Sequence, residues 1–476
     1  MKLHFIQEPL LEFGQDKHIC PKAGITQYDV YDTRFDARAR RDRIFVGAVG
    51  TSDTLSRLAV WLEKCSNHIL PPENSKQPTL FPGFCGFNPE SGFKAELVLE
   101  EGITRPINNS DIRNIIKIAN ENDRVNEAVE TYYQQVKFLA QNRAVDLIVC
   151  IIPTRLYNKI ATEKQKPIEE TAIDEELDDN IETNFRRALK AKAMHLGKPL
   201  QLMKELSLDS NPKTQQDDAT KAWNFCTALY YKANQTVPWK LTTNINRPSI
   251  CFVGIGFYRS RDKKVLNTSL AQIFDELGNG VILRGTPVNI DKNDRQPHLT
   301  EQQAYELLKR ALGEYEFALS NSPGRLVMHK SSNYTEAEID GFRQAATEAR
   351  VKTVDFVTIL DTDMRLFREG IYPPYRGTHI ELDESTHLLY TRGAVEYYRT
   401  YPGVYIPQPI EIRIVESDES PRVICQEILG LTKMNWNNTQ FDGKYPITIQ
   451  CARYVGQVMK YLGEHNQPQI RYSFYM

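Results

Sequence analysis

Residues 43–50 read RIFVGAVG, and residues 51–66 continue with TSDTLSRLAVWLEKCS. The first run is typical of a buried strand, and the second predicts a helix that Thr51 can cap, because a threonine hydroxyl accepts a hydrogen bond from the first helical turn. A second apolar run, VDLIVCII at residues 145–152, ends at Pro153. Continuous apolar runs of this length are typical of central parallel strands.

Strand and helix patterns alternate along the rest of the chain. Strands are predicted at residues 249–258, 325–329 and 353–360, a hairpin near 281–284, and helices at 120–142, 300–319, 335–349 and 446–462. This alternation indicates an α/β protein whose ligands bind at strand carboxyl ends and helix amino ends. Periodicity alone permits many α/β folds.

Composition sets broad limits on function. The 476 residues suffice for two or three domains. The 59 basic and 61 acidic residues give a net charge of −2, so a surface for nucleic acid would have to be locally basic. Basic residues gather at 34–43 (Arg38 among them) and 190–204, whereas the acidic segment 169–182 is most simply a solvated loop.

Cellular location is predicted from what the sequence lacks. It has neither an apolar run of membrane-spanning length nor a signal-peptide pattern at its start, and we expect a cytoplasmic protein. The eight cysteines form no CxxC pair and are expected to be reduced core residues.

Four polar residues between positions 184 and 241 can hold a phosphate. In NFRRALKAKAMHLGKPLQ (184–201), Arg186 and Lys190 are four apart and share one helical face. Gly197 ends that helix, after which Gln201 can enter a strand, and Lys232 lies near the end of the next predicted helix. A doubly ionised phosphate needs several such donors on rigid elements. Judged by spacing alone, two basic residues four apart more often mark a solvent-exposed helix face than a phosphate site.

The order of these residues resembles the guide-end pocket of the Argonaute MID domain. There, a basic or aromatic residue, a lysine four positions later, a glutamine and a lysine on the following helix hold the 5′-phosphate of the guide strand. Arg186 stands where many long Argonautes have tyrosine, and Arg187 takes that place if the helix register differs by one. The segment LTKMNWNNTQFDGKYPITIQCARYVG (431–456) resembles the end of the PIWI domain in short prokaryotic Argonautes.

The resemblance implies a Rossmann-like MID domain followed by an RNase H-like PIWI domain. VPWKL at residues 237–241 looks like the junction between them. The predicted domains are a linker-like segment at 1–40 that packs on PIWI, MID at 41–240 and PIWI at 241–476. The first 35 residues are rich in turn-forming types and keep part of the family's linker pattern.

The PIWI half is predicted to be catalytically inactive, so that the protein is not an enzyme. Cleavage by an RNase H-like site requires several carboxylates around two divalent ions. The family's catalytic positions fall on Gly256, on Lys330, and near Gln450 or Cys451. Lys330 would repel Mg²⁺ and could contact the nucleic-acid backbone instead; equally, His329 and Lys330 could be ordinary polar residues at a strand end. GxSxG, Walker and HExxH motifs are absent.

The tail QIRYSFYM (469–476) is apolar and aromatic and is expected to dock. In Argonautes, the C-terminal carboxylate can reach the MID pocket and share a metal ion with the first guide phosphates. The resemblance therefore implies a bound Mg²⁺ with Met476 and Gln201 as ligands. Alternatively, the aromatic residues simply bury against PIWI.

The implied function is that of a short prokaryotic Argonaute. Such a protein would bind a guide, expected to be RNA, and recognise single-stranded target DNA of plasmids or phage by base pairing, without cutting it. It would form a heterodimer with an APAZ-containing effector protein, sirtuin-like or TIR-type, that depletes NAD in prokaryotic immunity. Two alternatives remain: a catalytically active guided endonuclease, and an α/β module that binds a small phosphate ester.

Overall fold

The computed structural model describes most of the chain. The described residues are 1–35, 40–72, 75–160, 181–209, 216–234, 236–242, 248–261, 265–274, 280–288, 290, 296–403, 405–463 and 468–476. Arg38 of the predicted basic cluster lies outside them, as does the predicted acidic segment except for its last two positions, which begin a helix.

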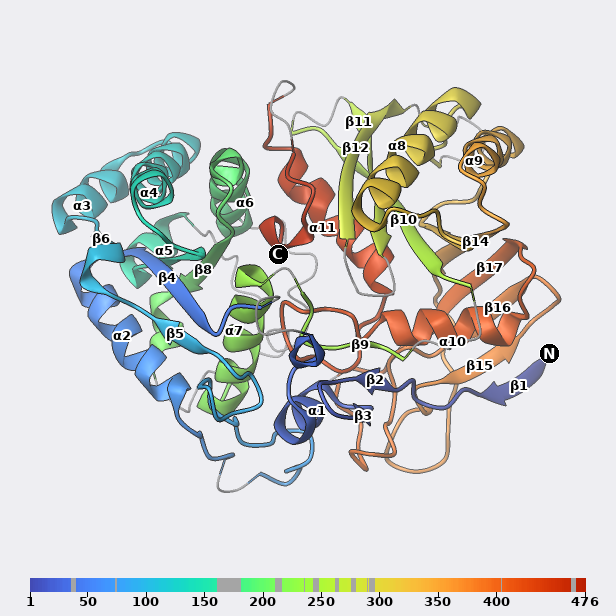
Figure 1. Ribbon diagram of the computed structural model, residues 1–476, viewed down its shortest axis with the longest axis horizontal. Coiled ribbons are helices and arrows are strands. Elements are labelled where there is room, and N and C mark those ends of the chain that lie inside the picture. The colour runs from blue at the N-terminus through green and yellow to red at the C-terminus, as the bar shows by residue number, and fades with distance from the viewer. Residues whose placement is uncertain are drawn as a thin grey trace.

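The first unit of the fold is a parallel sheet covered by helices on both faces (Figure 1). Its strand order is β5 (Glu96–Val98), β4 (Arg43–Gly50), β7 (Leu147–Ile152) and β8 (Leu200–Lys204), and β6 (Thr104–Pro106) also pairs with β4. The helices are α2 (Ser52–Ser66), α3 (Asn109–Lys117), α4 (Glu121–Asn142), α5 (Thr154–Ile160), α6 (Ile181–Ala193) and α7 (Asp218–Ala233). We call this the five-stranded unit.

Alternation along β7 explains the two layers of helices. Leu147, Val149 and Ile151 pack in one hydrophobic cluster with residues of α2 and α7. Ile148 and Cys150 belong to a second cluster with residues of α4 and α6. Because successive side chains of a strand point to opposite faces, a continuous apolar strand buries both faces, as the sequence predicts. The predicted cap is confirmed, since the Thr51 side chain accepts a hydrogen bond from the backbone N of Thr54.

The second unit contains a nine-stranded mixed sheet with the order β1-β15-β16-β17-β14-β13-β10-β11-β12. Its strands are β1 (Lys2–Phe5), β10 (Ile250–Arg259), β11 (Leu266–Phe274), β12 (Gly280–Val288), β13 (Arg325–Lys330), β14 (Thr353–Asp361), β15 (Thr378–Glu381), β16 (Thr386–Leu389) and β17 (Ile410–Glu416). β13 lies between β10 and β14 and is parallel to both. The other pairings are antiparallel.

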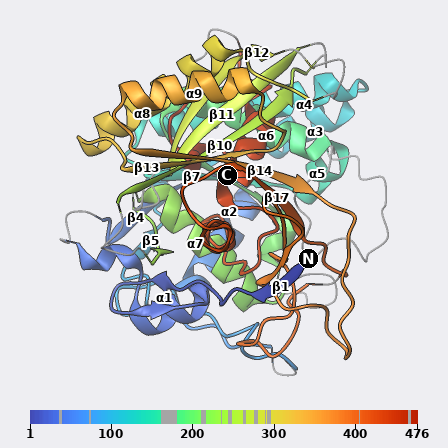
Figure 2. The ribbon, with the colours of Figure 1, turned by 90° about the vertical axis from the view of Figure 1, so that its right-hand side faces the viewer.

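Helices cover both faces of the nine-stranded sheet. Helices α8 (Glu301–Leu319) and α9 (Glu336–Glu348) lie on one face (Figure 2), and α10 (Pro421–Leu431) and α11 (Ile447–Met459) lie on the other. α11 packs directly on β10 because Gly254 leaves room for it. A Cβ atom at Gly254 would lie 2.2 Å from the carbonyl oxygen of Thr448.

The first 35 residues contain more regular structure than their turn-rich composition predicts. Pro21 begins helix α1 (Pro21–Tyr28), and a proline is well tolerated at that first position. β2 (Leu11–Glu12) lies between β3 (Lys17–His18) and β9 (Lys240–Leu241), and η1 spans Tyr31–Arg34. β1 pairs with β15 of the nine-stranded sheet. The predicted domain boundaries themselves stay a prediction.

No helix of the described residues is both long and apolar enough to cross a membrane.

Candidate functional site

Two helices bring three cationic side chains into one place. Arg186 and Lys190 lie four residues apart on α6, and Lys232 lies in the last turn of α7. Both lysines are almost completely buried, with 3% of Lys190 and 4% of Lys232 exposed. Lysines are rarely buried unless something pairs with them, so the surroundings of these two side chains point to their role.

Gln201 joins them from the parallel sheet. The 3-10 turn after α6 ends at Gly197, whose φ of 68° is left-handed, and the chain then enters β8. The ammonium Nζ of Lys232 donates a hydrogen bond to Gln201 Oε1 at 2.7 Å. The structure therefore places the predicted glutamine beside the predicted lysine.

Burial and neighbouring positive charges lower the pKa values of both lysines in this cluster. Burial lowers the pKa of Lys190 well below its usual value, and the charges of Arg186 and Lys232 lower it further. Burial also lowers the pKa of Lys232 to about 7, with a further contribution from Arg186. No carboxylate of the described residues is among the causes of either shift. An anion between these groups would be attracted by all of them and would favour the charged form of both lysines.

One residue of this site was missed by sequence reasoning. Lys232 Nζ also donates to Asn437 Oδ1 at 3.3 Å. Asn437 follows α10 and lies 205 residues further along the chain than Lys232. It belongs to the segment that resembles the end of PIWI domains, but neither spacing nor periodicity relates it to α7.

The C-terminal tail lies against the same helix. Its short helix η7 (Tyr472–Phe474) packs on α7, and Met476 is buried with 4% exposed. Met476 belongs to the same hydrophobic cluster as Tyr231 and Trp436. The expectation that the tail docks is confirmed, while a role of Met476 and Gln201 as metal ligands stays a prediction.

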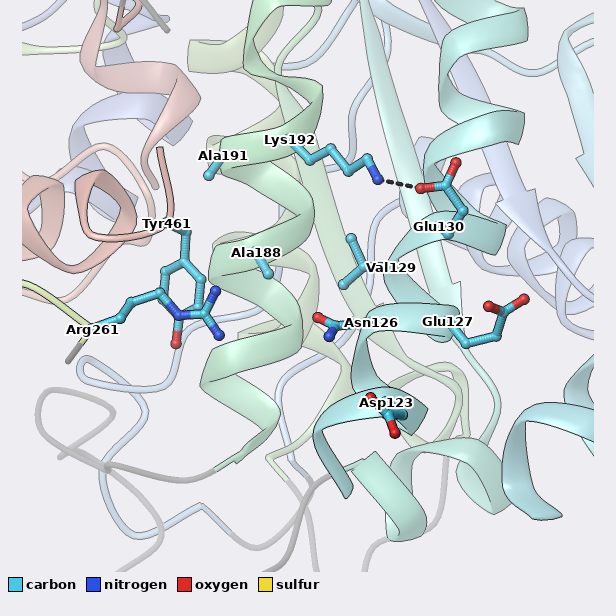
Figure 3. A pocket seen from close by; sticks show the side chains of 10 residues that line it. All are labelled: Asp123, Asn126, Glu127, Val129, Glu130, Ala188, Ala191, Lys192, Arg261 and Tyr461. Atoms are coloured by element: carbon cyan, nitrogen blue, oxygen red, sulfur yellow. Dashed lines mark hydrogen bonds and ion pairs between the residues drawn. The ribbon is translucent and has the colours of Figure 1, made fainter. Parts of the chain in front are cut away.

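A cavity of about 590 Å³ lies between α4, α6 and the nine-stranded unit (Figure 3). Asp123, Glu127 and Glu130 line it from α4, and among its described lining residues Lys192 and Arg261 carry positive charge. Lys192 is already paired with Glu130, as the dashed line shows. The cavity is therefore polar with an acidic excess and is a poorer place for an anion than the Arg186–Lys190–Lys232 cluster.

The predicted catalytic positions lie in the nine-stranded unit. Gly256 is buried in β10, Lys330 ends β13, and Cys451 is buried in α11. Among the described residues, no group of three or more His, Cys, Asp or Glu is arranged to hold a metal ion.

Lys330 is fully buried, with an exposed fraction of 0%. Its Nζ lies 2.6 Å from Glu338 Oε1 and donates to the carbonyl oxygen of Asn333 at 2.7 Å. The suggestion that Lys330 contacts a nucleic-acid backbone is therefore wrong, because its charge is paired inside the protein. No sequence pattern predicted that Glu338, on α9, would pair with Lys330.

The comparisons with known proteins agree on one architecture. No family model matches the sequence. The Argonaute protein of Aquifex aeolicus (strain VF5) is 26% identical over 233 residues, which are 47% of this chain and 29% of that relative.

Solved structures match over nearly the whole chain. Clostridium butyricum Argonaute bound to a guide DNA and a target DNA matches with a TM-score of 0.67 and 13% identity, covering 100% of this chain and 55% of that one. Aquifex aeolicus Argonaute with externally bound siRNA matches with a TM-score of 0.59 and 17% identity, over 99% and 55% of the two chains. Drosophila Piwi matches with a TM-score of 0.60 and 14% identity, over 99% and 56%.

The fold is therefore the mixed α/β MID–PIWI fold of Argonaute proteins. That the five-stranded unit is the MID part and the nine-stranded unit is PIWI stays a prediction. More particularly, the sequence is similar to that of the Argonaute protein of Aquifex aeolicus over the 233 matched residues. The predicted resemblance and fold class are confirmed. The chain spans about half the length of these solved Argonaute and Piwi chains, and the aligned region covers less than a third of the curated relative.

Proposed function

We propose that this protein binds the 5′-phosphate of a guide nucleic acid at Arg186, Lys190, Gln201 and Lys232. The observation that carries the proposal is that two almost completely buried lysines lie together, with Lys232 Nζ on Gln201 Oε1 and with Arg186 near enough to lower the pKa of both. Such a cluster favours a ligand with high negative charge at one end. A terminal phosphate carries close to two charges at neutral pH and presents three oxygen acceptors.

Each side chain has a distinct part in this binding. Lys190 and Lys232 donate charge-assisted hydrogen bonds, and their burial excludes water that would weaken those bonds. Arg186 contributes a guanidinium at the outer end of the site. Gln201 holds the Lys232 ammonium in place and can turn its amide N–H groups toward a phosphate oxygen.

The test compares two guides of identical sequence, one with a 5′-phosphate and one with a 5′-hydroxyl. The wild-type protein should prefer the phosphate, and Lys190→Ala with Lys232→Ala should remove the preference. Each charge-assisted hydrogen bond contributes about 1.5–3 kcal/mol, so the double variant should lose roughly 100-fold or more in affinity for the phosphorylated guide.

A matched control separates the pocket from general charge. Lys192→Ala with Lys198→Ala also removes two positive charges, but these lysines contact Glu130 and the carbonyl oxygen of Val145 instead. That variant should keep the preference for the 5′-phosphate. Equal binding of both guides by the wild type would contradict the proposal. Tight binding of inorganic phosphate or a mononucleotide, without any gain from a longer strand, would favour the small phosphate-ester module.

We also propose that the PIWI half binds a target without cutting it. The support is that Gly256 and Cys451 offer no carboxylate and that Lys330 is held by Glu338. Incubating the guide-loaded protein with a labelled complementary strand and Mn²⁺ tests this. Cleavage at one defined position would establish the alternative, an active guided endonuclease.

We propose that a bound Mg²⁺, with the C-terminal carboxylate of Met476 and Gln201 as ligands, adds to this binding. Mg²⁺ requires a near-octahedral set of oxygen ligands, usually including carboxylates. Here, Gln201 Oε1 accepts a hydrogen bond from Lys232, and two further cations lie nearby. A divalent ion would therefore need further oxygen ligands, which the phosphates of the bound strand and the carboxylate of Met476 would supply. Measuring guide affinity in Mg²⁺ and in EDTA tests the prediction.

The biological role follows from the resemblance to short prokaryotic Argonautes. In this proposal, an RNA guide directs the protein to single-stranded DNA of plasmids or phage, and target capture activates an APAZ-containing effector that depletes NAD. Co-expression with such a sirtuin-like or TIR-type protein should yield a heterodimer on gel filtration. NAD should fall only when guide and complementary DNA are both present, and loss without target would contradict the role.

A further inference from the structure

A segment of the nine-stranded unit reaches across to the cation site. After α10, the chain runs alongside α7. Trp436 Nε1 donates to the carbonyl oxygen of Trp239, which follows α7 in the chain, at 3.0 Å. The ring centroids of Trp436 and Tyr231 are 5.0 Å apart. The backbone N and hydroxyl of Thr439 both contact Asn224 Oδ1 at 3.2 Å. Contacts on both sides of residue 437 therefore hold this segment against α7.

Asn437 stands where that segment meets Lys232. Its Oδ1 accepts from Lys232 Nζ at 3.3 Å, and its backbone N donates to Asn435 Oδ1 at 3.0 Å. The orientation of the amide follows from chemistry, because an ammonium group can only donate. The amide nitrogen Nδ2 is bonded to the same planar carbon as Oδ1 and carries two N–H donors.

We propose that Asn437 completes the anion site by donating from Nδ2 to the phosphate that Lys190 and Lys232 bind. This inference rests on the proposed function and adds a residue of the PIWI half to a site otherwise built from the MID half. The 3.3 Å contact to Lys232 is long for a hydrogen bond, whereas the 2.7 Å contact to Gln201 is short. The Asn437 contact is thus the weaker of the two, and a phosphate oxygen can replace it at Lys232.

A neutral amide suits this position better than a charged group. A carboxylate at residue 437 would form an ion pair with Lys232 and repel the phosphate. An amide fixes the ammonium weakly and leaves its charge for the ligand. Because Asn437 and Lys232 belong to different units, a phosphate held by both would also strengthen the contact between the MID and PIWI halves.

The test uses Asn437→Ala and Asn437→Asp, with Asn438→Asp as the control. Asn438 Oδ1 accepts a local hydrogen bond from the backbone N of Gln440, which an aspartate can also accept. The readout is the ratio of the Kd values for 5′-hydroxyl and 5′-phosphate guides. General structural damage weakens binding of both guides, so a change in the ratio reports on the phosphate contact.

Asn437→Ala should lower the ratio about 10-fold, and Asn437→Asp about 100-fold, while Asn438→Asp should leave it within about 2-fold. If the wild type shows no preference, the proposed function fails. If the wild type prefers the phosphate and the Lys190–Lys232 double variant does not, but both Asn437 variants keep the wild-type ratio, this inference alone is overturned. Should the aspartate variant fail to fold, Asn437→Ala decides by the same ratio.

Discussion

Lys232 Nζ and Gln201 Oε1 lie 2.7 Å apart, and this hydrogen bond joins the last turn of α7 to the second residue of β8. The contact brings together the C-terminal end of a helix and the start of the edge strand of the parallel sheet, and not the strand carboxyl ends at which the sequence pattern predicts ligands. The pKa of this lysine is about 7, because burial lowers it and the charge of Arg186 lowers it further.

Guide affinity should fall as the pH rises. The pKa of Lys232 is about 7 in the free protein, and that of Lys190 is lowered well below its usual value. A phosphate raises both, so binding takes up protons and weakens above pH 7, by at most about tenfold per pH unit for each lysine that must gain a proton. Kd values measured from pH 6.5 to 8.5 should show this for the 5′-phosphate guide, whereas a constant ratio to the 5′-hydroxyl guide would contradict it.

As the pH rises, the lowered pKa of Lys232 should make guide binding weaker, but it should make the folded protein more stable. The unfolded chain keeps a lysine pKa near 10.4, so between about pH 7 and 10 it binds the proton that folded Lys232 has lost. The contribution of Lys232 to the free energy of unfolding therefore rises with pH in that window. Replacement of Lys232 by methionine should remove its share of this pH dependence and leave that of Lys190, and urea unfolding at several pH values would detect the smaller slope.

Breaking the Lys330–Glu338 pair should be costly. Lys330→Met leaves Glu338 buried without its cation, and losing one partner of a buried pair costs about 3–5 kcal/mol. The double variant Lys330→Met with Glu338→Gln should recover much of this loss, because no lone charge remains. Urea unfolding measures both, and a single variant as stable as the wild type would show that the pair contributes little.

Gly254→Ala should destabilise the nine-stranded unit by about 1–3 kcal/mol, because the new Cβ would overlap the carbonyl oxygen of Thr448 and push α11 away from β10. Gly313→Ala is a control that should change the stability in the opposite direction. It lies inside α8 with nothing within 4 Å of the new Cβ, and alanine there should stabilise the helix by roughly 0.5–1 kcal/mol. Thermal melts of the two variants should move in opposite directions.

Glu8 should anchor the N-terminal segment. Its carboxylate pairs with Arg376 and Lys433, both at 3.0 Å. Burial raises the pKa of Glu8, but these two cations together lower it below its usual value. Its contribution to stability is therefore present above pH 4.5 and is lost as the pH falls through the lowered pKa.

Glu8→Ala should reduce the free energy of unfolding at pH 7 by about 3–5 kcal/mol, since two buried cations lose their partner. Glu369→Ala, on the surface, should change it by less than about 0.5 kcal/mol. Equal stability of the two variants would mean that Glu8 is not an anchor.

Local sequence patterns were sufficient to predict most of the helices and strands. The strand predicted at residues 43–50 is β4 residue for residue, and the helix predicted at 300–319 is α8 with Thr300 as its cap. These elements bury one or both faces, so their apolar spacing is visible in the sequence. Helix α1 was missed because its short, weakly apolar sequence carries little such pattern.

Local sequence patterns predict the alternating α/β elements and place Arg186, Lys190, Gln201 and Lys232 at a helix face, a strand start and a helix end. Which distant residues meet these four depends on how the two units pack together. Asn437 contacts Lys232 across 205 residues, and Arg376 contacts Glu8 across 368. Helix and strand patterns arise from neighbours a few residues apart, whereas a buried charge finds its partner through the packing of whole units, which no local period encodes.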